Sequence, residues 1–263
     1  MSSLRTPLTI TVYRGFKDVG AFVWSPFVTK LEARLRFGGL PYATEAGSPR
    51  QGPKGKIPYV DITRGGTKTT LGDSSLIVAA LCADGVLSDL AAPLSKVDRA
   101  HDLALRALLE DKLSFYHAWE RWTQNYYTMR DHVLWPIPWP LRVVVGSLVH
   151  RNVVAALHGQ GTGRLGADEI AAFRREIWAS FADLLLESRV RQARPADSAE
   201  PFWVLAGPEP TDADASLFGF VVSTLLATAG PGSQADVKSF PVLLEYARRI
   251  KERYFPEYEA LPA

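Results

Sequence analysis

The stretch Lys56-Ile57-Pro58-Tyr59-Val60, followed soon after by Gly72-Asp73-Ser74-Ser75-Leu76-Ile77, decides the fold of this 263-residue chain. The first stretch predicts a strand entered through an Ile-Pro bond, which can be cis at modest cost. The second predicts a strand that ends at a helix N-terminus. We expect the Ile57 backbone to pair with another extended backbone, and Asp73 and Ser74 to hold a ligand's charged end. Together these features suit a short extended peptide.

Local patterns around these stretches predict an α/β unit with the order β-α-β-β-β-α, which is thioredoxin-like. Ser25 before Pro26 favours a helix start, because the hydroxyl caps free N–H groups and proline fits the first turn. Gly38 and Gly39 end that helix. The expected strands cover residues 8–13, 40–44, 57–62 and 67–71, with a polar loop over 48–55, and the expected helices cover 27–37 and 74–83.

The rest of the chain predicts an all-helical unit, because helical periodicity replaces the strand patterns. The expected helices cover residues 95–127, 141–157, 167–190, 211–229 and 240–254, with a polar loop over 191–201. A linker is expected over residues 84–94. The predicted domains are therefore residues 1–86, α/β, and residues 93–263, all-α.

Composition bounds the class of protein. The chain is 47% hydrophobic and 22% charged, and its 30 Lys and Arg are balanced by 28 Asp and Glu. The charged residues are scattered along the chain and the net charge is only +2, which argues against nucleic-acid binding. The single cysteine, Cys82, fits a reducing compartment. The N-terminal sequence lacks the charged, apolar and small-residue regions of a secretory signal peptide, so we expect a cytoplasmic protein. Residues 140–157 contain Arg142, His150 and Arg151, so we expect no membrane span.

Four segments give the chain a resemblance to the glutathione S-transferase superfamily: residues 25–35, 53–60, 72–77 and 205–219. In the last segment, Thr211 and Asp214 are spaced as an N-terminal capping box. The resemblance implies a thioredoxin-like domain followed by an all-α domain. Residues 109–122 and 157–170 resemble the failed-axon-connections/metaxin-like branch. That branch includes fungal glutathione S-transferase-like proteins of secondary metabolism, among them pseurotin-pathway-type enzymes that are said to isomerise a polyene.

The resemblance implies which residues bind glutathione, as cosubstrate or as catalytic thiol. Ser25 stands where serine-type members place the group that meets the thiol, and a helix N-terminus there favours the thiolate. The implied glutathione contacts are the Ile57 backbone beside Pro58, the pair Asp73 and Ser74, and one of the lysines Lys54 and Lys56.

Each of these roles has a structural alternative. Ser25 can serve as a helix cap alone, and Asp73 with Ser74 as an ordinary N-cap pair. Tyr13 and Lys17 are alternative groups for stabilising a thiolate. Related proteins often carry cysteine at the position of Val28, so a mixed-disulfide mechanism is disfavoured here. We expect Cys82 to be buried packing.

A dense aromatic group marks the predicted helix over residues 95–127. Phe115, Trp119, Trp122 and Tyr126 recur at spacings of four, three and four, so they are predicted to share one face. In transferases this helix lines the pocket for an apolar electrophile, and interdomain core is the alternative. The Trp135–Trp139 segment is a candidate lid over the same cleft.

Other motifs are weaker. The G-x-G-x-x-G pattern of residues 161–166 does not follow a strand, so it predicts no nucleotide site, and the five histidines show no metal-ligand spacing. We therefore predict a transferase that adds the glutathione thiolate to a small apolar electrophile. The product is a conjugate, or a cis isomer if the thiol leaves after bond rotation. A non-catalytic metaxin-like scaffold is the alternative, a reductase is disfavoured, and a homodimer is left open.

Overall fold

A four-stranded sheet with the strand order β2-β1-β3-β4 organises the N-terminal part of the chain. A computed structural model describes residues 8–192 and 199–262. The strands are β1 (Leu8–Tyr13), β2 (Ala43–Glu45), β3 (Tyr59–Arg64) and β4 (Thr67–Gly72). Strand β1 pairs with β2 in parallel and with β3 antiparallel, and β3 pairs antiparallel with β4. The predicted hairpin at Gly65 and Gly66 is confirmed.

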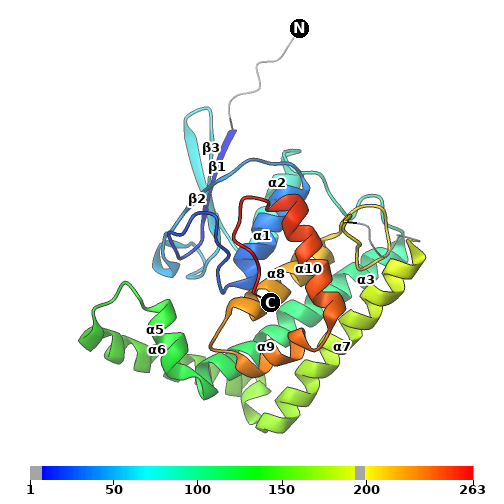
Figure 1. Cartoon of the computed structure of the whole chain (residues 1–263). Coiled ribbons are helices and arrows are strands. Elements are labelled where there is room, and N and C mark those ends of the chain that lie inside the picture. Colours follow the sequence, from blue (N-terminus) through cyan, green and yellow to red (C-terminus); the bar gives the residue numbers. More distant parts are fainter. Residues whose placement is uncertain (1–7, 193–198, 263) are drawn as a thin grey trace.

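Helices α1 (Pro26–Phe37) and α2 (Ser74–Ala83) lie on one side of the sheet, between it and the remaining helices (Figure 1). Ile10 and Val12 alternate inward from β1 and pack with Leu31 and Leu35 of α1 and with Ile77 of α2. Burying these branched side chains on one face is the expected result of the period of two in the strand. The predicted order β-α-β-β-β-α is confirmed.

The second strand and the third begin later than predicted. The Leu40 N–H bonds to the Leu35 carbonyl and so finishes α1, and Pro41 has no N–H to donate. Pairing therefore starts at Ala43, opposite Thr11. The third strand starts at Tyr59 rather than at residue 57, and the predicted loop over 48–55 contains a short 3-10 helix, η1 (Pro49–Gln51).

The rest of the chain is helical, as predicted. Its elements are α3 (Lys96–Ala107), η2 (Leu108–Leu113), α4 (Ser114–Trp119), η3 (Glu120–Gln124), α5 (Tyr126–Val133), α6 (Trp139–Gln160), η4 (Thr162–Arg164), α7 (Ala167–Arg191), α8 (Asp212–Leu226), α9 (Pro231–Lys238) and α10 (Pro241–Tyr254). The fold is therefore a thioredoxin-like domain joined to an all-helical domain. We propose that the boundary lies over residues 86–93, because the hydrophobic cluster that packs under the sheet extends along the chain no further than Leu87.

Two predicted helices are divided in the structure. The helix expected over residues 95–127 contains two π-helical segments, η2 and η3, and is interrupted at Asn125 with φ −122° and ψ 38°. The helix expected over residues 211–229 ends at Leu226, and Pro231 starts a separate helix, α9. Part of the predicted polar loop, residues 193–198, lies outside the described residues.

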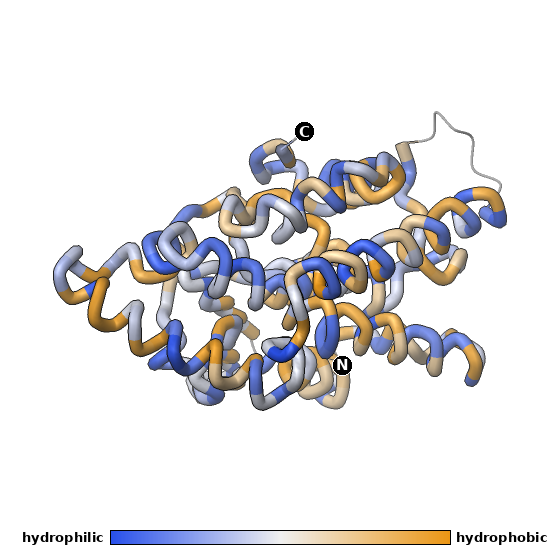
Figure 2. The backbone as a smooth tube through the Cα atoms, turned by 90° about the horizontal axis from the view of Figure 1, so that it is seen from below, coloured by the Kyte–Doolittle hydropathy of each residue, from blue (hydrophilic) through white to orange (hydrophobic). Residues whose placement is uncertain are grey.

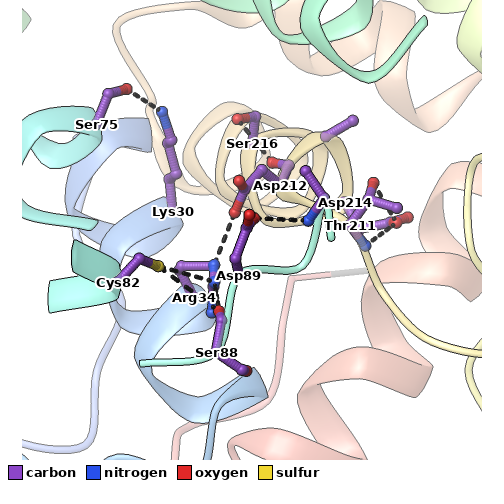
Figure 3. A network of polar contacts seen from close by, with 12 residues as sticks. Lys30, Arg34, Ser75, Cys82, Ser88, Asp89, Thr211, Asp212, Asp214 and Ser216 are labelled. Atoms are coloured by element: carbon purple, nitrogen blue, oxygen red, sulfur yellow. Dashed lines mark hydrogen bonds and ion pairs between the residues drawn. The ribbon is translucent and has the colours of Figure 1, made fainter. Parts of the chain in front are cut away.

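Helix α1 is the element that joins the two domains. Every residue from Val28 to Leu35 is buried, including two cations. The Lys30 Nζ lies 2.7 Å from Glu110 Oε1, and the Arg34 Nε lies 2.7 Å from Asp212 Oδ1 at the start of α8. Figure 3 shows Arg34 reaching from α1 to Asp212, while Lys30 also meets Ser75 of α2. Buried charges need such partners, so these pairs fix how α1 sits against α8.

Helices α1 and α8 also approach each other closely at Gly219. A Cβ atom at this position would lie 2.4 Å from the Pro26 carbonyl oxygen and 2.9 Å from the Lys30 N. Both contacts are to backbone, which cannot move aside as a flexible side chain can. The missing side chain of Gly219 therefore sets the distance between α8 and the first turn of α1.

We predict that Gly219→Ala lowers the free energy of unfolding by about 2–3 kcal/mol, because the added methyl group forces α1 and α8 apart. Urea denaturation followed by circular dichroism measures this. Gly159→Ala is the matched control, since a Cβ there meets nothing within 4 Å. It should leave stability unchanged or raise it. Equal effects of the two substitutions would contradict the close approach.

Candidate functional site

The strand register brings three segments of the chain to one end of the sheet. Tyr13, the last residue of β1, pairs with Tyr59, the first residue of β3, and Tyr59 pairs with Gly72, the last residue of β4. Three segments therefore adjoin the same end of the sheet: the loop that leads to Ser25, the Ile57-Pro58 bond and the pair Asp73–Ser74. The structure thus places the three predicted parts of the binding site at one end of the sheet.

No side chain among the described residues caps the N-terminus of α1. Ser25 occupies the N-cap position with φ −84° and ψ 114°, and Pro26 follows it in the first turn. The capping bond expected from the Ser25 hydroxyl is not formed, and the first turn contains no acidic residue. The first N–H groups of a helix carry a partial positive charge. Both this charge and the partly exposed hydroxyl are therefore available to an anion.

The residue before Ser25 is anchored from the helical domain. The Trp24 carbonyl accepts a hydrogen bond from Arg121 Nη1 at 3.1 Å and a second, short one from the Ser223 hydroxyl. Arg121 Nη2 also donates to Ser223 Oγ at 3.2 Å. Segments far apart in sequence, from η3 and α8, thus hold the chain immediately ahead of the α1 N-terminus.

Arg121 is a buried cation beside this site. Its side chain has no carboxylate within ion-pair distance among the described residues, since the neighbouring Glu120 binds Arg174 at 3.0 Å instead. Burial lowers the pKa of Arg121 to about 10, with Glu120 opposing the shift. The guanidinium therefore stays charged at neutral pH. It adds positive potential next to the N-terminus of α1.

An aromatic stack covers the same loop. Trp24 lies against His132 of α5 with ring centroids 3.5 Å apart, and Phe16 stacks on His132 at 4.7 Å. Trp135 lies 6.5 Å beyond Phe16. Burial first, and then the charge of Arg121, lower the pKa of His132 to about 4. The imidazole is therefore neutral at pH 7.

The Ile57-Pro58 peptide bond is cis, as the sequence suggested. Among the described residues, the backbone N–H and carbonyl of Ile57 make no backbone hydrogen bond outside the regular elements. The side chain of Ile57 packs against the loop after β1: a Cβ on Gly15, whose φ is +86°, would lie 2.8 Å from Ile57 Cδ1. Lys54 and Lys56 are both exposed near this end of the sheet.

Asp73 and Ser74 begin α2 in an unusual conformation. Asp73 has φ +78°, a region that residues other than glycine rarely adopt. Its Oδ1 accepts hydrogen bonds from the N–H groups of Ser75 at 3.0 Å and Leu76 at 3.2 Å, so it caps the helix. No side-chain hydrogen bond to Oδ2 is found within the described ranges. Ser74 is buried, and Ser75 accepts a bond from Lys30 at 2.9 Å.

The four predicted aromatic residues of the pocket differ in surroundings. Trp122 is buried and lies 6.5 Å from Tyr126, whose ring meets His150 of α6 at 4.8 Å. Trp119 is partly buried against the helical core, and Phe115 is partly exposed. A π-helical turn adds a residue to the turn, so the face predicted from a regular α-helix is offset between Trp119 and Tyr126.

The alternative thiol-stabilising groups are placed elsewhere. The Tyr13 hydroxyl donates to Asp61 Oδ2 at 2.7 Å, and this bond raises the Tyr13 pKa to about 12. Burial raises the pKa of the partly exposed Cys82 thiol. Lys17 is exposed. Within residues 8–192 and 199–262, no three His, Cys, Asp or Glu side chains cluster so as to hold a metal ion.

Sequence reasoning missed Arg121, His132 and Ser223 at this site. Their contacts with Trp24 span about a hundred positions or more of sequence, up to 199 for Ser223. No local spacing signals such contacts. The one available signal was an arginine inside the segment 109–122 that carries the family resemblance.

Comparison with known proteins supports the fold. A family model described as the glutathione S-transferase N-terminal domain matches residues 26–129. A glutathione S-transferase from Rhodospirillum rubrum F11 is 16% identical over 97% of this chain and 94% of its own, with a TM-score of 0.56. A glutathione transferase family member from Pseudomonas fluorescens pf-5, crystallised with two glutathione molecules bound, is 14% identical over 94% of this chain and 90% of its own, with a TM-score of 0.54.

A third similar structure is a glutathione transferase homolog from Lodderomyces elongisporus with two glutathione molecules per subunit. It is 14% identical over 95% of this chain and 96% of its own, with a TM-score of 0.50. These identities are low, and what the likeness establishes is the shared fold. The chain has the two-domain architecture of glutathione transferases.

We predict that acidification destabilises the protein partly through His132. Its folded-state pKa of about 4 lies below the ordinary value of about 6.5. The unfolded chain therefore binds a proton that the folded chain does not, and stability falls as pH drops from about 6.5 to about 4. His132→Phe keeps an aromatic ring in the stack and should lose less stability over this range.

Urea denaturation at several pH values between 4 and 7 measures this difference. His101→Gln is the control, because His101 is exposed on α3. It should follow the wild-type pH profile. If His132→Phe and the wild type lose stability in parallel, His132 is not buried as a neutral group.

Proposed function

We propose that this protein is a glutathione-dependent transferase that adds the glutathione thiolate to a small apolar electrophile. The observation that carries the proposal is the start of α1 at Ser25, which no described side chain caps and which lies at the same end of the sheet as the Ile57-Pro58 and Asp73–Ser74 segments. The fold shared with glutathione-bound transferases supports it. Cytoplasm is the proposed compartment, since the single cysteine suits a reducing environment.

In this proposal glutathione lies across the end of the sheet that the three segments share. The free backbone groups of Ile57 pair with its cysteinyl part, and Asp73 and Ser74 hold its γ-glutamyl amine and carboxylate. Lys54 or Lys56 meets the glycyl carboxylate. Asp73 can cap α2 and bind the amine at the same time, because both capping hydrogen bonds go to its Oδ1 and leave its Oδ2 for the ligand.

Ser25 then donates its hydroxyl hydrogen bond to the sulfur. A free thiol with a pKa near 8.5 is mostly protonated at neutral pH, and the thiolate is the nucleophile. The α1 N-terminus and the buried charge of Arg121 both favour the anion. The thiol proton leaves to solvent, and the sulfur forms a bond to one carbon of an activated double bond.

Two outcomes follow from the same addition. If the adduct is protonated at the neighbouring carbon, the product is a conjugate. If the carbon–carbon bond rotates and the sulfur leaves, the double bond reforms as the other isomer and the thiol is regenerated. The electrophile is proposed to lie along Phe115, Trp119, Trp122 and Tyr126, near the Trp135–Trp139 segment. The segments 109–122 and 157–170 support a place in the metaxin-like branch, with fungal secondary metabolism as the setting.

A non-catalytic interaction protein of the metaxin-like kind is the second candidate. One observation favours it: the Asp73 carboxylate already serves the fold by capping α2. A protein that has lost thiol chemistry would still keep this residue.

We predict that Ser25→Ala lowers kcat/KM for glutathione and chlorodinitrobenzene by about 10²-fold, as expected for the loss of one hydrogen bond to a developing anion. Glutathione binding, measured by calorimetry, should change little. The control is Ser180→Ala, because among the described residues the Ser180 hydroxyl donates to the Glu176 carbonyl of its own helix and to nothing at the candidate site. Full activity of Ser25→Ala would remove Ser25 from the chemistry, and a wild type that neither binds nor turns over glutathione would favour the second candidate.

We predict that Asp73→Asn weakens glutathione binding by about tenfold, because a hydrogen bond to the charged amine loses its ionic partner. The thermal stability should stay close to wild type. Asparagine also tolerates positive φ, and its side-chain oxygen can accept the two capping bonds. Calorimetry and thermal melts report the two effects separately. Unchanged glutathione affinity in Asp73→Asn would assign Asp73 to capping alone.

A further inference from the structure

Helix α6 projects from the body of the protein together with α5. Figure 1 shows the two helices extending at the lower left, below the sheet, and Figure 2 shows hydrophobic stretches along this projecting part. Helix α6 has 22 residues, and only 11% of its most apolar stretch is buried. By length and composition alone this helix could cross a membrane. A core helix of similar hydropathy would be mostly buried.

Large apolar side chains of α6 lie in solvent along one face. Leu141, Val144 and Leu148 are 56%, 58% and 56% exposed, and their spacings of three and four place them on one side of the helix. At the N-terminal end of α6, Trp139 is 68% exposed and Trp135 is 45% exposed. The row Leu141, Val144 and Leu148 is therefore an exposed apolar face, with two exposed tryptophans near its N-terminal end, and apolar exposure of this kind marks a binding surface.

The opposite side of α6 is firmly attached. A Cβ on Gly146 would lie 2.7 Å from Arg130 and 2.8 Å from the Tyr126 hydroxyl of α5. Arg142 donates to the carbonyls of Ile137 and Trp135 at 3.0 Å each, which fixes the two exposed tryptophans relative to the helix. The exposed face therefore has a fixed position in the folded protein.

Charge identifies the kind of partner. Residues 133–167 contain three arginines but no Asp or Glu. Toward the C-terminal end of α6, a shallow groove of about 520 Å³ is lined by His150, Arg151, Val154, Ala155, His158 and Gly159. Asp131 of α5 pairs with Arg130 at 2.9 Å and, more distantly, with Arg142 of α6 at 3.8 Å, whereas Arg151 has no ion pair among the described residues. A partner must therefore supply both negative charge and an apolar layer.

We propose that the exposed face of α6 binds an anionic lipid membrane in the plane of its surface. Leu141, Val144 and Leu148 enter the acyl boundary, the tryptophans lie at headgroup level, and Arg151 with the groove meets lipid phosphates. Spanning is disfavoured because Arg142 and Arg151 lie inside the helix. A second copy is disfavoured because α6 carries arginines and no Asp or Glu of its own, so two such helices would repel each other. This proposal does not depend on the proposed enzymatic function.

The test is co-sedimentation of the full-length protein with vesicles of phosphatidylcholine, with and without phosphatidylserine. The wild type should bind the vesicles that contain phosphatidylserine, and high salt should release it. Leu148→Glu should lower the partition coefficient by about tenfold, since it puts a charge in the apolar face. The matched control is Leu186→Glu on α7, where the native leucine is 42% exposed. It should bind as the wild type does.

Arg151→Glu should weaken binding to phosphatidylserine vesicles and reduce its salt dependence, while circular dichroism shows that each variant is folded. Three results would overturn the proposal. They are equal binding to both vesicle types, undiminished binding of Leu148→Glu, and a wild-type dimer that Leu148→Glu dissociates while no vesicles are bound. The last result would assign the face to a second copy of the chain.

Discussion

The burial of α1 between the sheet and α8 is the constraint on which the rest of the structure depends. The apolar side of α1 packs under β1 and β3, and its other side meets α8 so closely that only glycine fits at position 219. Two buried cations, Lys30 and Arg34, lie on this second side and pair with acidic residues of the helical domain. These contacts fix the direction and position of α1. Consequently they also fix the position of its N-terminus, which lies at the end of the sheet shared with the Ile57-Pro58 and Asp73–Ser74 segments.

Both domains contribute to the candidate site. The sheet supplies the shared end, while Arg121 and Ser223 hold the Trp24 carbonyl from the helical domain. A buried guanidinium is costly to desolvate, and its donation to two main-chain carbonyls offsets part of that cost. Its charge remains without an ion-pair partner among the described residues. The arrangement combines a helix N-terminus with a nearby cation, which is the electrostatic environment that favours a thiolate over a thiol.

Sequence patterns predicted the elements whose causes are local. The strand over residues 8–13 follows from alternation, the start and end of α1 follow from Pro26 and Gly38, and the turn between β3 and β4 follows from two glycines. The cis bond and the helix start at Asp73 and Ser74 also carry local signals. Together these were sufficient for the fold and for the end of the sheet at which a ligand is proposed to bind.

The features that the sequence did not predict depend on contacts between distant residues. The π-helical segments η2 and η3 keep a helical pattern in sequence, so a single helix was expected. The capping bond expected at Ser25 is absent, and the stack of Trp24 on His132 joins two domains. The exposure of α6 could not be predicted from the sequence either, because its hydropathy is equally typical of a buried helix. Such features follow from packing, which no local spacing specifies.

The central claim is that the fixed, uncapped start of α1 stabilises a bound thiolate. The most direct measurement is the pKa of the glutathione thiol on the protein, followed by the ultraviolet absorbance of the thiolate across pH. The account predicts a value at least about one unit below the 8.5 typical of a free cysteine thiol, returning toward it in Ser25→Ala. A bound thiol that titrates like free glutathione in the wild type would contradict the account.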